Sequence, residues 1–436
     1  MARAQHNPWS WIPSLYYAEG IPYVAVMTVS VIMYKRLDIS NTEIALYTSW
    51  LYLPWVIKPL WSPLVDVIKT KRAWILTTQL LIGAGMAGVA LTLPGSDFFR
   101  YSLAFFWLMA FSSATHDIAA DGFYMLGLNA HQQAFFVGIR STFYRLAMIS
   151  GQGLLVMFAG YAESRSGSHA VAWSITFYLL AGVFVLFFIY HRFVLPLPPK
   201  DGQNAIAAPV DIFRGYGETM VSFFRKDRIL VILAFLLLFR FAEAQLVKIA
   251  APFLLDGTEA GGLGLGTTEV GFVYGTIGVL MLTLGGLMGG FLAARHGLKS
   301  WLWWMVLAIN LPNAVYIFLA YVQPQSFWLI NAAVGLEQFG YGFGFTAYML
   351  YMIYASRGEH ETAHFAICTG FMALGMMIPG MFSGAIQEWL GYQHFFVWIL
   401  MATVPSFIVA GLIPLDREFG RQQVITQDHD EHPESP

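Results

Sequence analysis

The stretch ILVILAFLLLFRFAEAQLVKIAAPFL, residues 229–254, decides the fold class. It is longer than the roughly 20 apolar residues of helix that cross the hydrocarbon of a bilayer. Its only charged residues are Arg240, Glu243 and Lys248. Because a helix satisfies its own backbone hydrogen bonds, such a stretch can cross lipid. It therefore predicts a transmembrane helix that carries three charges within the membrane.

Similar apolar runs recur along the chain, so the fold class is an all-α membrane protein. The sequence is 57% hydrophobic and only 11% charged, whereas a soluble domain carries roughly 25% charged residues. Lipid must therefore replace water around most of the surface. Twelve spans are expected at residues 9–34, 43–66, 74–94, 101–127, 134–161, 170–195, 229–254, 269–294, 300–321, 326–355, 362–388 and 393–414.

The longest polar interruption divides these spans six and six. It begins PLPPKDGQN at Pro196 and continues DIFRGYGETMVSFFRKDR, residues 211–228, which can form an amphipathic helix or act as a plain tether. The expected organisation is an N-terminal six-helix bundle (1–195), a cytoplasmic linker (196–228) and a C-terminal six-helix bundle (229–414). The acidic tail (415–436) is expected to be a disordered cytoplasmic segment.

The loop charges predict the orientation of the chain. With the N-terminus in the cytoplasm, most loop lysines and arginines lie inside, and only Lys35, Arg36, Arg100 and Arg165 lie outside. Both termini are therefore expected to be cytoplasmic. The net charge of −2 gives no reason to expect a nucleic-acid partner. Cys368 is the only cysteine, which excludes a disulfide framework, and neither a metal nor a cofactor is expected.

A repeated loop follows the second span of each half. The first copy reads SPLVDVIKTKR, residues 62–72, with Asp66 ahead of a basic cluster; the second reads GGFLAARHGLK, residues 289–299, with Ala294 where the acid would stand. Both resemble the short loop motif of the major facilitator superfamily. The resemblance implies two pseudo-symmetric halves of six helices that alternate between two openings.

A closer resemblance extends across nearly all spans, to the AmpG-type muropeptide permeases and the related acetyl-CoA transporters. The matching stretches are EGIP (19–22), IKPLWSPLVD (57–66), SSATHDIAADGF (112–123), FYRLAM (143–148), FRFAEA (239–244), TEVGFV (268–273) and LEQFGYGFG (336–344). The resemblance implies proton-driven import of a sugar-peptide such as an anhydro-muropeptide across the bacterial inner membrane, for cell-wall recycling. Glu19 departs from the family pattern, which is usually uncharged at that position.

Intramembrane charges are costly, so they usually face a cavity or a partner. Every intramembrane carboxylate falls on span one, four, seven or ten, the spans that line the central cavity in this superfamily. Asp117 and Asp121 share one helix face because they are four residues apart. They can exchange a proton with the cavity, or a basic residue on span two or five can hold them as a static lock between helices.

Candidate residues follow from these positions. The proton-coupling candidates are Asp121, Asp117, Glu243, Glu337 and Glu19. The candidates for substrate binding are Glu19, Tyr124, Arg145, Arg240, Glu243, Glu337 and Tyr341. The charges expected to act in gating or structure are Lys58, Asp66, Arg72, Arg140 and Arg295. The small-residue stripes on the spans are interpreted as packing within a monomer.

Two alternatives remain open. One is a transporter of another polar metabolite, such as an amino sugar, a sialate or an acyl-CoA-like compound. The other is an intramembrane zinc protease, because His360, Glu361 and His364 match H-E-x-x-H, in which two histidines on one helix face hold zinc. The sequence offers no third ligand near this motif, although a catalytic zinc site needs three protein ligands. No covalent catalysis is therefore expected.

Overall fold

The computed structural model describes residues 7–198, 201, 209–416 and 418–421, and these residues are almost entirely helical. The first half contains α1 (Ile12–Val24), α2 (Ser30–Arg36), α3 (Asn41–Trp50), α4 (Leu53–Ile68), α5 (Lys71–Thr92), α6 (Phe98–Gly127), α7 (Ala130–Ile149), α8 (Val156–Ser166) and α9 (His169–Val194). The second contains α11 (Ile229–Leu238), α12 (Phe241–Leu255), α13 (Thr267–Val270), α14 (Val279–His296), α15 (Leu298–Asn310), α16 (Ala314–Val322), α17 (Phe327–Ser356), α18 (Glu361–Met401) and α19 (Val404–Leu412).

The described helices form the twelve expected spans. Eight helical stretches are long and apolar enough to cross a membrane by length and composition. The last of these, Glu361–Leu412, holds two spans that separate at Gly391, where φ is 72°. The interrupted pair α3–α4 and the charge-bearing α6 and α17 complete the set. Twelve spans in two halves, the predicted fold class, are therefore confirmed.

Several spans are not the continuous helices that hydropathy predicts. In the first span, helix continues through Pro22 and widens into a π-helical turn, Ala25–Val29, so the span is distorted but not broken. Since proline lacks an N–H, it removes one hydrogen bond from the preceding turn. The seventh span covers the expected residues 229–254, but a turn at Phe239 and Arg240 interrupts its helix between α11 and α12.

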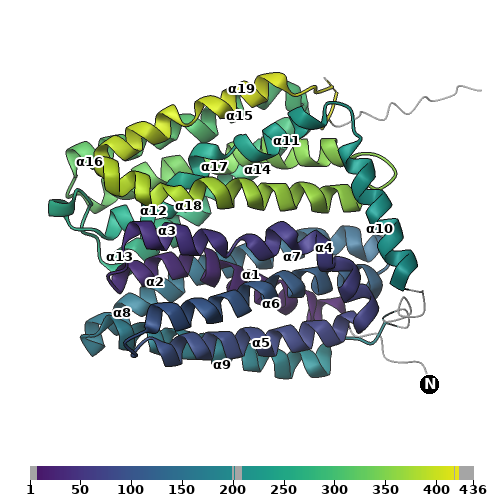
Figure 1. Cartoon of the computed structure of the whole chain (residues 1–436), viewed down its shortest axis with the longest axis horizontal. Helices are drawn as coiled ribbons and strands as arrows, with labels where there is room; N and C mark the ends of the chain where they lie inside the picture. Colours follow the sequence, from purple (N-terminus) through teal and green to yellow (C-terminus); the bar gives the residue numbers. More distant parts are fainter. Residues whose placement is uncertain (1–6, 199–200, 202–208, 417, 422–436) are drawn as a thin grey trace, which may run out of the picture.

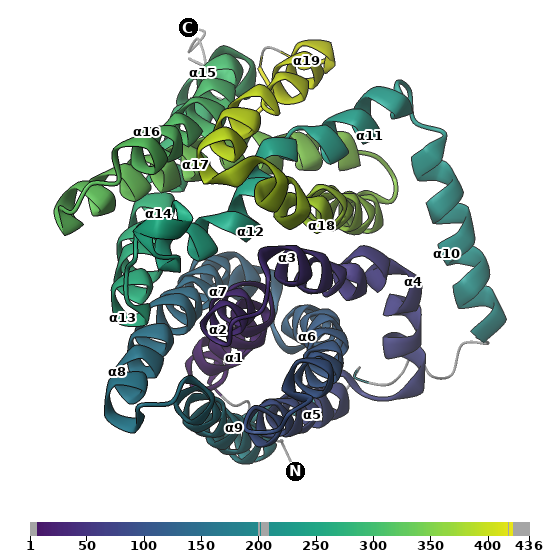
Figure 2. The same ribbon diagram turned by 60° about the vertical axis from the view of Figure 1, so that its left-hand side comes forward.

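The two halves lie side by side with their helices nearly parallel to the long axis of the molecule (Figure 1). Helix α10 (Pro209–Phe224) lies outside both bundles (Figure 2) and runs across one end of the molecule, on the right in Figure 1. This end is called the linker end below. The second part of the 196–228 segment is therefore helical, and Ser222 of α10 lies 2.9 Å from the imidazole Nε2 of His364 on α18.

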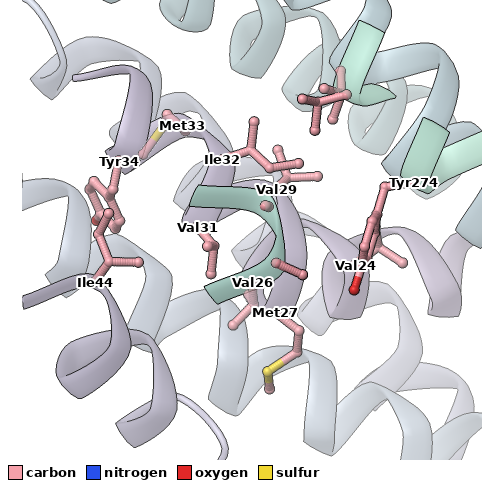
Figure 3. Close-up of a cluster of buried hydrophobic side chains, with 14 of the residues drawn as sticks. Val24, Val26, Met27, Val29, Val31, Ile32, Met33, Tyr34, Ile44 and Tyr274 are labelled. Carbon is pink, nitrogen blue, oxygen red and sulfur yellow. The ribbon is translucent and has the colours of Figure 1, made fainter. Parts of the chain in front are cut away.

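The halves pack closely at the end opposite the linker. Helix α3 of the first half runs against α18 of the second, and a Cβ placed on Gly384 would lie 2.0 Å from the backbone oxygen of Asn41. Similarly, a Cβ on Gly275 would lie 2.1 Å from the backbone nitrogen of Gly153. Only glycine permits backbones to approach this closely. The buried apolar cluster along α1 and α2 continues across this interface to Tyr274 (Figure 3).

Candidate functional site

A cluster of charged side chains lies inside the first half, where α1, α4, α6 and α7 meet. Lys58 of α4 forms an ion pair with Asp117 of α6. One turn further along α6, Asp121 accepts a hydrogen bond from Arg140 of α7, with an Nη1–Oδ1 distance of 3.0 Å. Thus the two carboxylates on one face of α6 each have a basic partner from a different helix, and the four side chains join three helices.

Glu19 adds a third carboxylate to this cluster from α1. Its side chain is only 9% exposed and interacts with Asp117, but its Oε2 atom has no hydrogen-bond partner among the described residues. Three residues earlier on the same helix, the Tyr16 hydroxyl donates to Asp121 Oδ1 over 3.2 Å and accepts from Arg140 Nη1 over 3.1 Å. Through Glu19 and Tyr16, α1 therefore contacts both carboxylates of α6: Glu19 interacts with Asp117, and Tyr16 binds Asp121.

Exposure within this cluster increases toward the linker end. The side chain of Asp121 is 44% exposed and that of Arg140 is 30% exposed, whereas Asp117 is 22% exposed. Asp121 precedes the end of α6 at Gly127 by six residues, which correspond to about 9 Å of helix. Asp121 is thus the most exposed carboxylate of the cluster, and it lies on the linker side of Asp117.

A second polar cluster occupies the other half around the break between α11 and α12. Arg240 caps α12, donates a hydrogen bond to the Tyr341 hydroxyl of α17 and lies over the Phe345 ring. Glu243 follows in the first turn of α12, and its Oε2 atom lacks a partner among the described residues. The interrupted helix thus presents one guanidinium and one carboxylate inside the bundle. Hydropathy alone does not mark the interruption, because the surrounding sequence is apolar.

Glu337 of α17 belongs to the same half but is held more rigidly. Its Oε2 accepts hydrogen bonds from Gln338 Nε2 at 3.0 Å and from the Tyr316 hydroxyl at 3.4 Å, and its side chain is almost fully buried. The carboxylates of Glu337 and Glu243 are close enough to influence each other. The second half therefore holds two acids in one buried polar region, which Tyr341 and Arg240 border.

Other predicted substrate residues have partners of their own. Arg145 of α7 reaches across to the second half, where its Nη1 donates to Thr283 Oγ1 of α14 over 3.3 Å. The Tyr124 hydroxyl donates to the backbone oxygen of Gln133, close to the turn between α6 and α7. Arg145 therefore lies between the halves, whereas Tyr124 lies near the linker end beside the guanidinium of Arg140.

Two of the predicted loop charges, Arg72 and Arg295, are not part of either cluster. Arg72 donates hydrogen bonds to the backbone oxygens of Arg192 and Leu195, so it ties α5 to the end of α9 within one half. Arg295 is exposed at the end of α14 and makes no ion pair among the described residues. The side chain of Asp66 lies outside the part that the structure describes. No contact between the halves is therefore assigned to these three residues.

At the end opposite the linker, polar side chains seal the interface between the halves. Lys35 forms an ion pair with Asp256 at 2.7 Å. Asn41 Nδ2 donates to Gln387 Oε1 at 2.6 Å and to the hydroxyl of Tyr392 at 2.9 Å. These contacts, together with hydrogen bonds from Thr42 to Glu388 at 3.0 and 2.6 Å, form what we call the outer seal. Each one joins the first half to the second.

The H-E-x-x-H segment lies where α10 meets α18. His360 caps α18, and the His364 ring contacts Ser222 and lies 5.5 Å from the ring of Phe223. Within the described residues, no group of three or more potential metal ligands is found. The motif therefore serves as a contact between the linker helix and the second half in this structure.

Some residues of the two clusters were missed by sequence reasoning. Tyr16 was not identified, although its spacing of three from Glu19 places both on one face of α1. Tyr316 and Gln338 hold Glu337, and both were overlooked because tyrosine and glutamine carry no charge to mark them. Outside the two clusters, Thr48 was also missed; its hydroxyl lies 2.9 Å from the ammonium of Lys248. Such partners depend on how each helix is rotated about its axis relative to its neighbours, and one sequence does not determine that rotation.

Comparisons with known proteins place these clusters in context. A family model described as Major Facilitator Superfamily matches residues 17–357. The anhydromuropeptide permease of Escherichia coli (strain K12) is 26% identical over 366 residues, which cover 81% of this chain and 69% of that protein. The putative transporter AmpG 4 of Rickettsia conorii is 23% identical over 409 residues, which cover 89% and 92% of the two chains.

Solved structures show the same fold at low identity. A D-xylose-proton symporter matches with a TM-score of 0.71 and 12% identity, covering 95% of this chain and 99% of that one. A mutant form of the nucleoside transporter NupG matches with a TM-score of 0.68 and 15% identity, covering 92% and 99% of the two chains. At these identities the likeness concerns the fold alone.

Proposed function

The chain belongs to the major facilitator superfamily and is a multi-pass membrane transporter rather than an enzyme, and we propose that it imports a sugar-peptide together with protons. This proposal takes the linker end as cytoplasmic, with both termini inside, in the inner membrane of a bacterium. It takes the working unit as a monomer, in which one chain supplies both clusters and the outer seal.

A charge imbalance carries the proton part of the proposal. Among the described residues, the first-half cluster brings together the carboxylates of Glu19, Asp117 and Asp121 with one lysine and one arginine, Lys58 and Arg140. An uncompensated charge inside a membrane protein is costly. This cluster is therefore neutral only when it holds one proton. In the second half, Glu243 follows the guanidinium of Arg240 in the first turn of α12, and Glu337 accepts hydrogen bonds from the neutral side chains of Tyr316 and Gln338.

The positions within the cluster suggest how such a proton moves. Glu19 is buried with a free oxygen, whereas Asp121 is exposed toward the linker end. With the outer seal closed, Asp121 is the carboxylate best placed to release a proton to the cytoplasm. When the outer seal opens, Glu19 and Asp117 take a proton from the other side, and protonation of Asp117 weakens its ion pair with Lys58, which holds α4 to α6. Rocking of the halves then couples the two steps.

The substrate part of the proposal rests on the relatives and on the chemistry of the interior. The proteins of the first comparisons carry the names anhydromuropeptide permease and AmpG. A sugar-peptide carries carboxylates, amides and sugar faces, which suit the guanidinium of Arg240 and the aromatic rings of Tyr341 and Phe345 beside it. Arg145, between the halves, offers a further cation.

Another polar metabolite is the second candidate, and Glu19 favours it. The acid at this position departs from the muropeptide permeases, so a substrate with an additional amino group fits the buried carboxylate better. Amino sugars have such a group, whereas sialate and acyl-CoA-like compounds are anionic. Competition by glucosamine against labelled anhydro-muropeptide distinguishes the two, because only a site for free amino sugars is blocked by glucosamine.

Uptake into proteoliposomes with an imposed pH gradient tests the main proposal. The wild type should accumulate labelled anhydro-muropeptide above its external concentration, and accumulation should stop when an ionophore collapses the gradient. Asp121→Asn should abolish accumulation but leave exchange of labelled for unlabelled substrate, because exchange needs no net proton movement. Uphill transport at the wild-type rate by this variant would exclude Asp121, and Glu19→Gln, Glu243→Gln and Glu337→Gln would then be compared.

A further inference from the structure

Lys248 is a buried cation that the proposed mechanism does not use. It lies on α12 with its side chain 2% exposed, and its Nζ donates to Thr48 Oγ1 of α3 over 2.9 Å. The ammonium also lies 5.2 Å from the centre of the Tyr52 ring. In the described part of the chain, no carboxylate forms an ion pair with it. A lysine buried in this way needs compensation that one hydroxyl and one ring supply only in part.

The position of Lys248 places it on a path between the halves. Its partner Thr48 belongs to the first half, and a Cβ on Gly380 of α18 would lie 3.5 Å from Lys248 Cγ and 2.7 Å from Ser49 Oγ. Helices α3, α12 and α18 therefore converge on this side chain. Helix α3 belongs to the first half, whereas α12 and α18 belong to the second. These contacts must therefore break when the halves separate at the outer seal.

The depth of Lys248 lies between the outer seal and the second-half cluster. Asp256 of the seal follows it by eight residues, or about 12 Å of chain along α12. Glu243 precedes it by five residues, or about 8 Å. A substrate that enters past the open seal thus meets the ammonium of Lys248 before it reaches Glu243, Arg240 or Tyr341.

From this placement we infer that Lys248 binds a carboxylate of the transported substrate when the outer seal is open, so that the transporter selects anionic substrates at its outer entrance. On closure, the Thr48 hydroxyl and the Tyr52 ring replace the carboxylate, and the substrate moves on toward Arg240. The inference rests on the proposed function only in its direction of transport and in the class of substrate. An ammonium on a flexible stem suits this role because it can follow a moving carboxylate.

One test measures transport. Lys248→Gln should raise the KM for anhydro-muropeptide about tenfold or more at little cost in maximal rate, while Lys248→Arg should keep the wild-type KM within about threefold. For an anhydro-muropeptide whose carboxyl groups are amidated, the wild type and Lys248→Gln should have the same KM. If Lys248→Gln raises the KM equally for the acid and the amidated substrate, or lowers the maximal rate alone, then Lys248 only supports the packing of α3 on α12.

A second test needs no substrate and separates this inference from the proposed function. Ser49→Cys in a Cys368→Ala background places a thiol beside Lys248, and its labelling from outside is compared for an anionic sulfonate-bearing and a cationic trimethylammonium-bearing methanethiosulfonate. A positive entrance should favour the anionic reagent by roughly tenfold relative to a free thiol, and Lys248→Gln should remove the preference. If the preference is absent, or survives Lys248→Gln, the inference is overturned; failure of muropeptide uptake alone overturns the proposed function instead.

Discussion

Replacement of Gly384 by alanine should open the outer seal. Gly384 lies where α18 packs on the first turn of α3, and an added Cβ would approach the backbone oxygen of Asn41 to 2.0 Å and the Cα of Thr42 to 2.7 Å. Both contacts are with backbone, so no side-chain rotation relieves them. Restoring an ordinary contact of 3.4 Å to the Asn41 oxygen requires α3 and α18 to move apart locally by about 1.4 Å.

The cost of this overpacking falls on one state of the transporter. Inserting a methyl group into a well-packed contact costs about 1–3 kcal/mol. Because α3 and α18 belong to different halves, the clash exists only while the seal is closed. The ratio of closed to open molecules should therefore fall by roughly 5-fold to 150-fold. The hydrogen bonds of Asn41 with Gln387 and of Thr42 with Glu388 also lengthen as the helices separate.

Thiol labelling measures this shift. In a Cys368→Ala background, Ser49→Cys lies below the seal and should react slowly with a membrane-impermeant maleimide added from outside. Gly384→Ala should raise that rate by at least 5-fold and lower substrate uptake. The matched control is Gly182→Ala, since a Cβ there meets nothing within 4 Å. Identical labelling and uptake in the Gly384 and Gly182 variants would refute the assignment of the α3–α18 contact as a seal.

Three further predictions concern other parts of the molecule. Lys58→Met should lower stability by about 3 kcal/mol or more because it leaves the Asp117 carboxylate unpaired, and Asp117→Asn in the same chain should recover most of the loss; thermal unfolding of purified protein in detergent checks both. Tyr16→Phe should remove the hydrogen bonds to Asp121 and Arg140 at a cost of about 1 kcal/mol, so proton-driven uptake should slow by several-fold while exchange is kept; a larger loss of exchange than of uptake would contradict it. His364→Ala should leave uptake within about twofold of wild type, and elemental analysis of both proteins should find no stoichiometric zinc; zinc lost together with peptide cleavage would contradict this outcome.

The number of spans and the placement of the charges were predictable from sequence, because both depend on local composition. Hydropathy over about 20 residues decides whether a helix can cross lipid. A charge within such a span must face the interior. For this reason, Glu19, Asp117, Glu243 and Glu337 could be assigned to the inner spans before any packing was known, and the all-helical two-half fold followed.

The pairing of those charges could not be predicted in the same way. Lys58, Arg140 and Arg145 were equal candidates for the two aspartates, but Arg145 turns to Thr283 of the other half. That choice depends on how α7 is rotated against α6 and α14, which no local pattern encodes. The break at Arg240 was likewise hidden, because neither glycine nor proline marks it. Tertiary contacts across α17 stabilise the interrupted helix there.

Two of the four basic residues that the orientation rule places outside, Lys35 and Arg36, lie at the outer seal and beside it. Lysine and arginine are normally sparse on the outer side of a membrane protein, and in the proposed orientation Lys35 and Arg36 lie adjacent on that side. Lys35 pairs with Asp256 across the halves. Arg36 Nη2 lies 3.3 Å from Glu163 Oε2, which also accepts a hydrogen bond from the Thr267 hydroxyl of the second half. Departures from sequence rules are expected at functional sites, and the departure at Lys35 and Arg36 coincides with contacts between the halves. Removing both charges of the Lys35–Asp256 ion pair, with Lys35→Gln and Asp256→Asn in one chain, should therefore loosen the outer seal. Neutralising Arg100 should leave the seal unchanged.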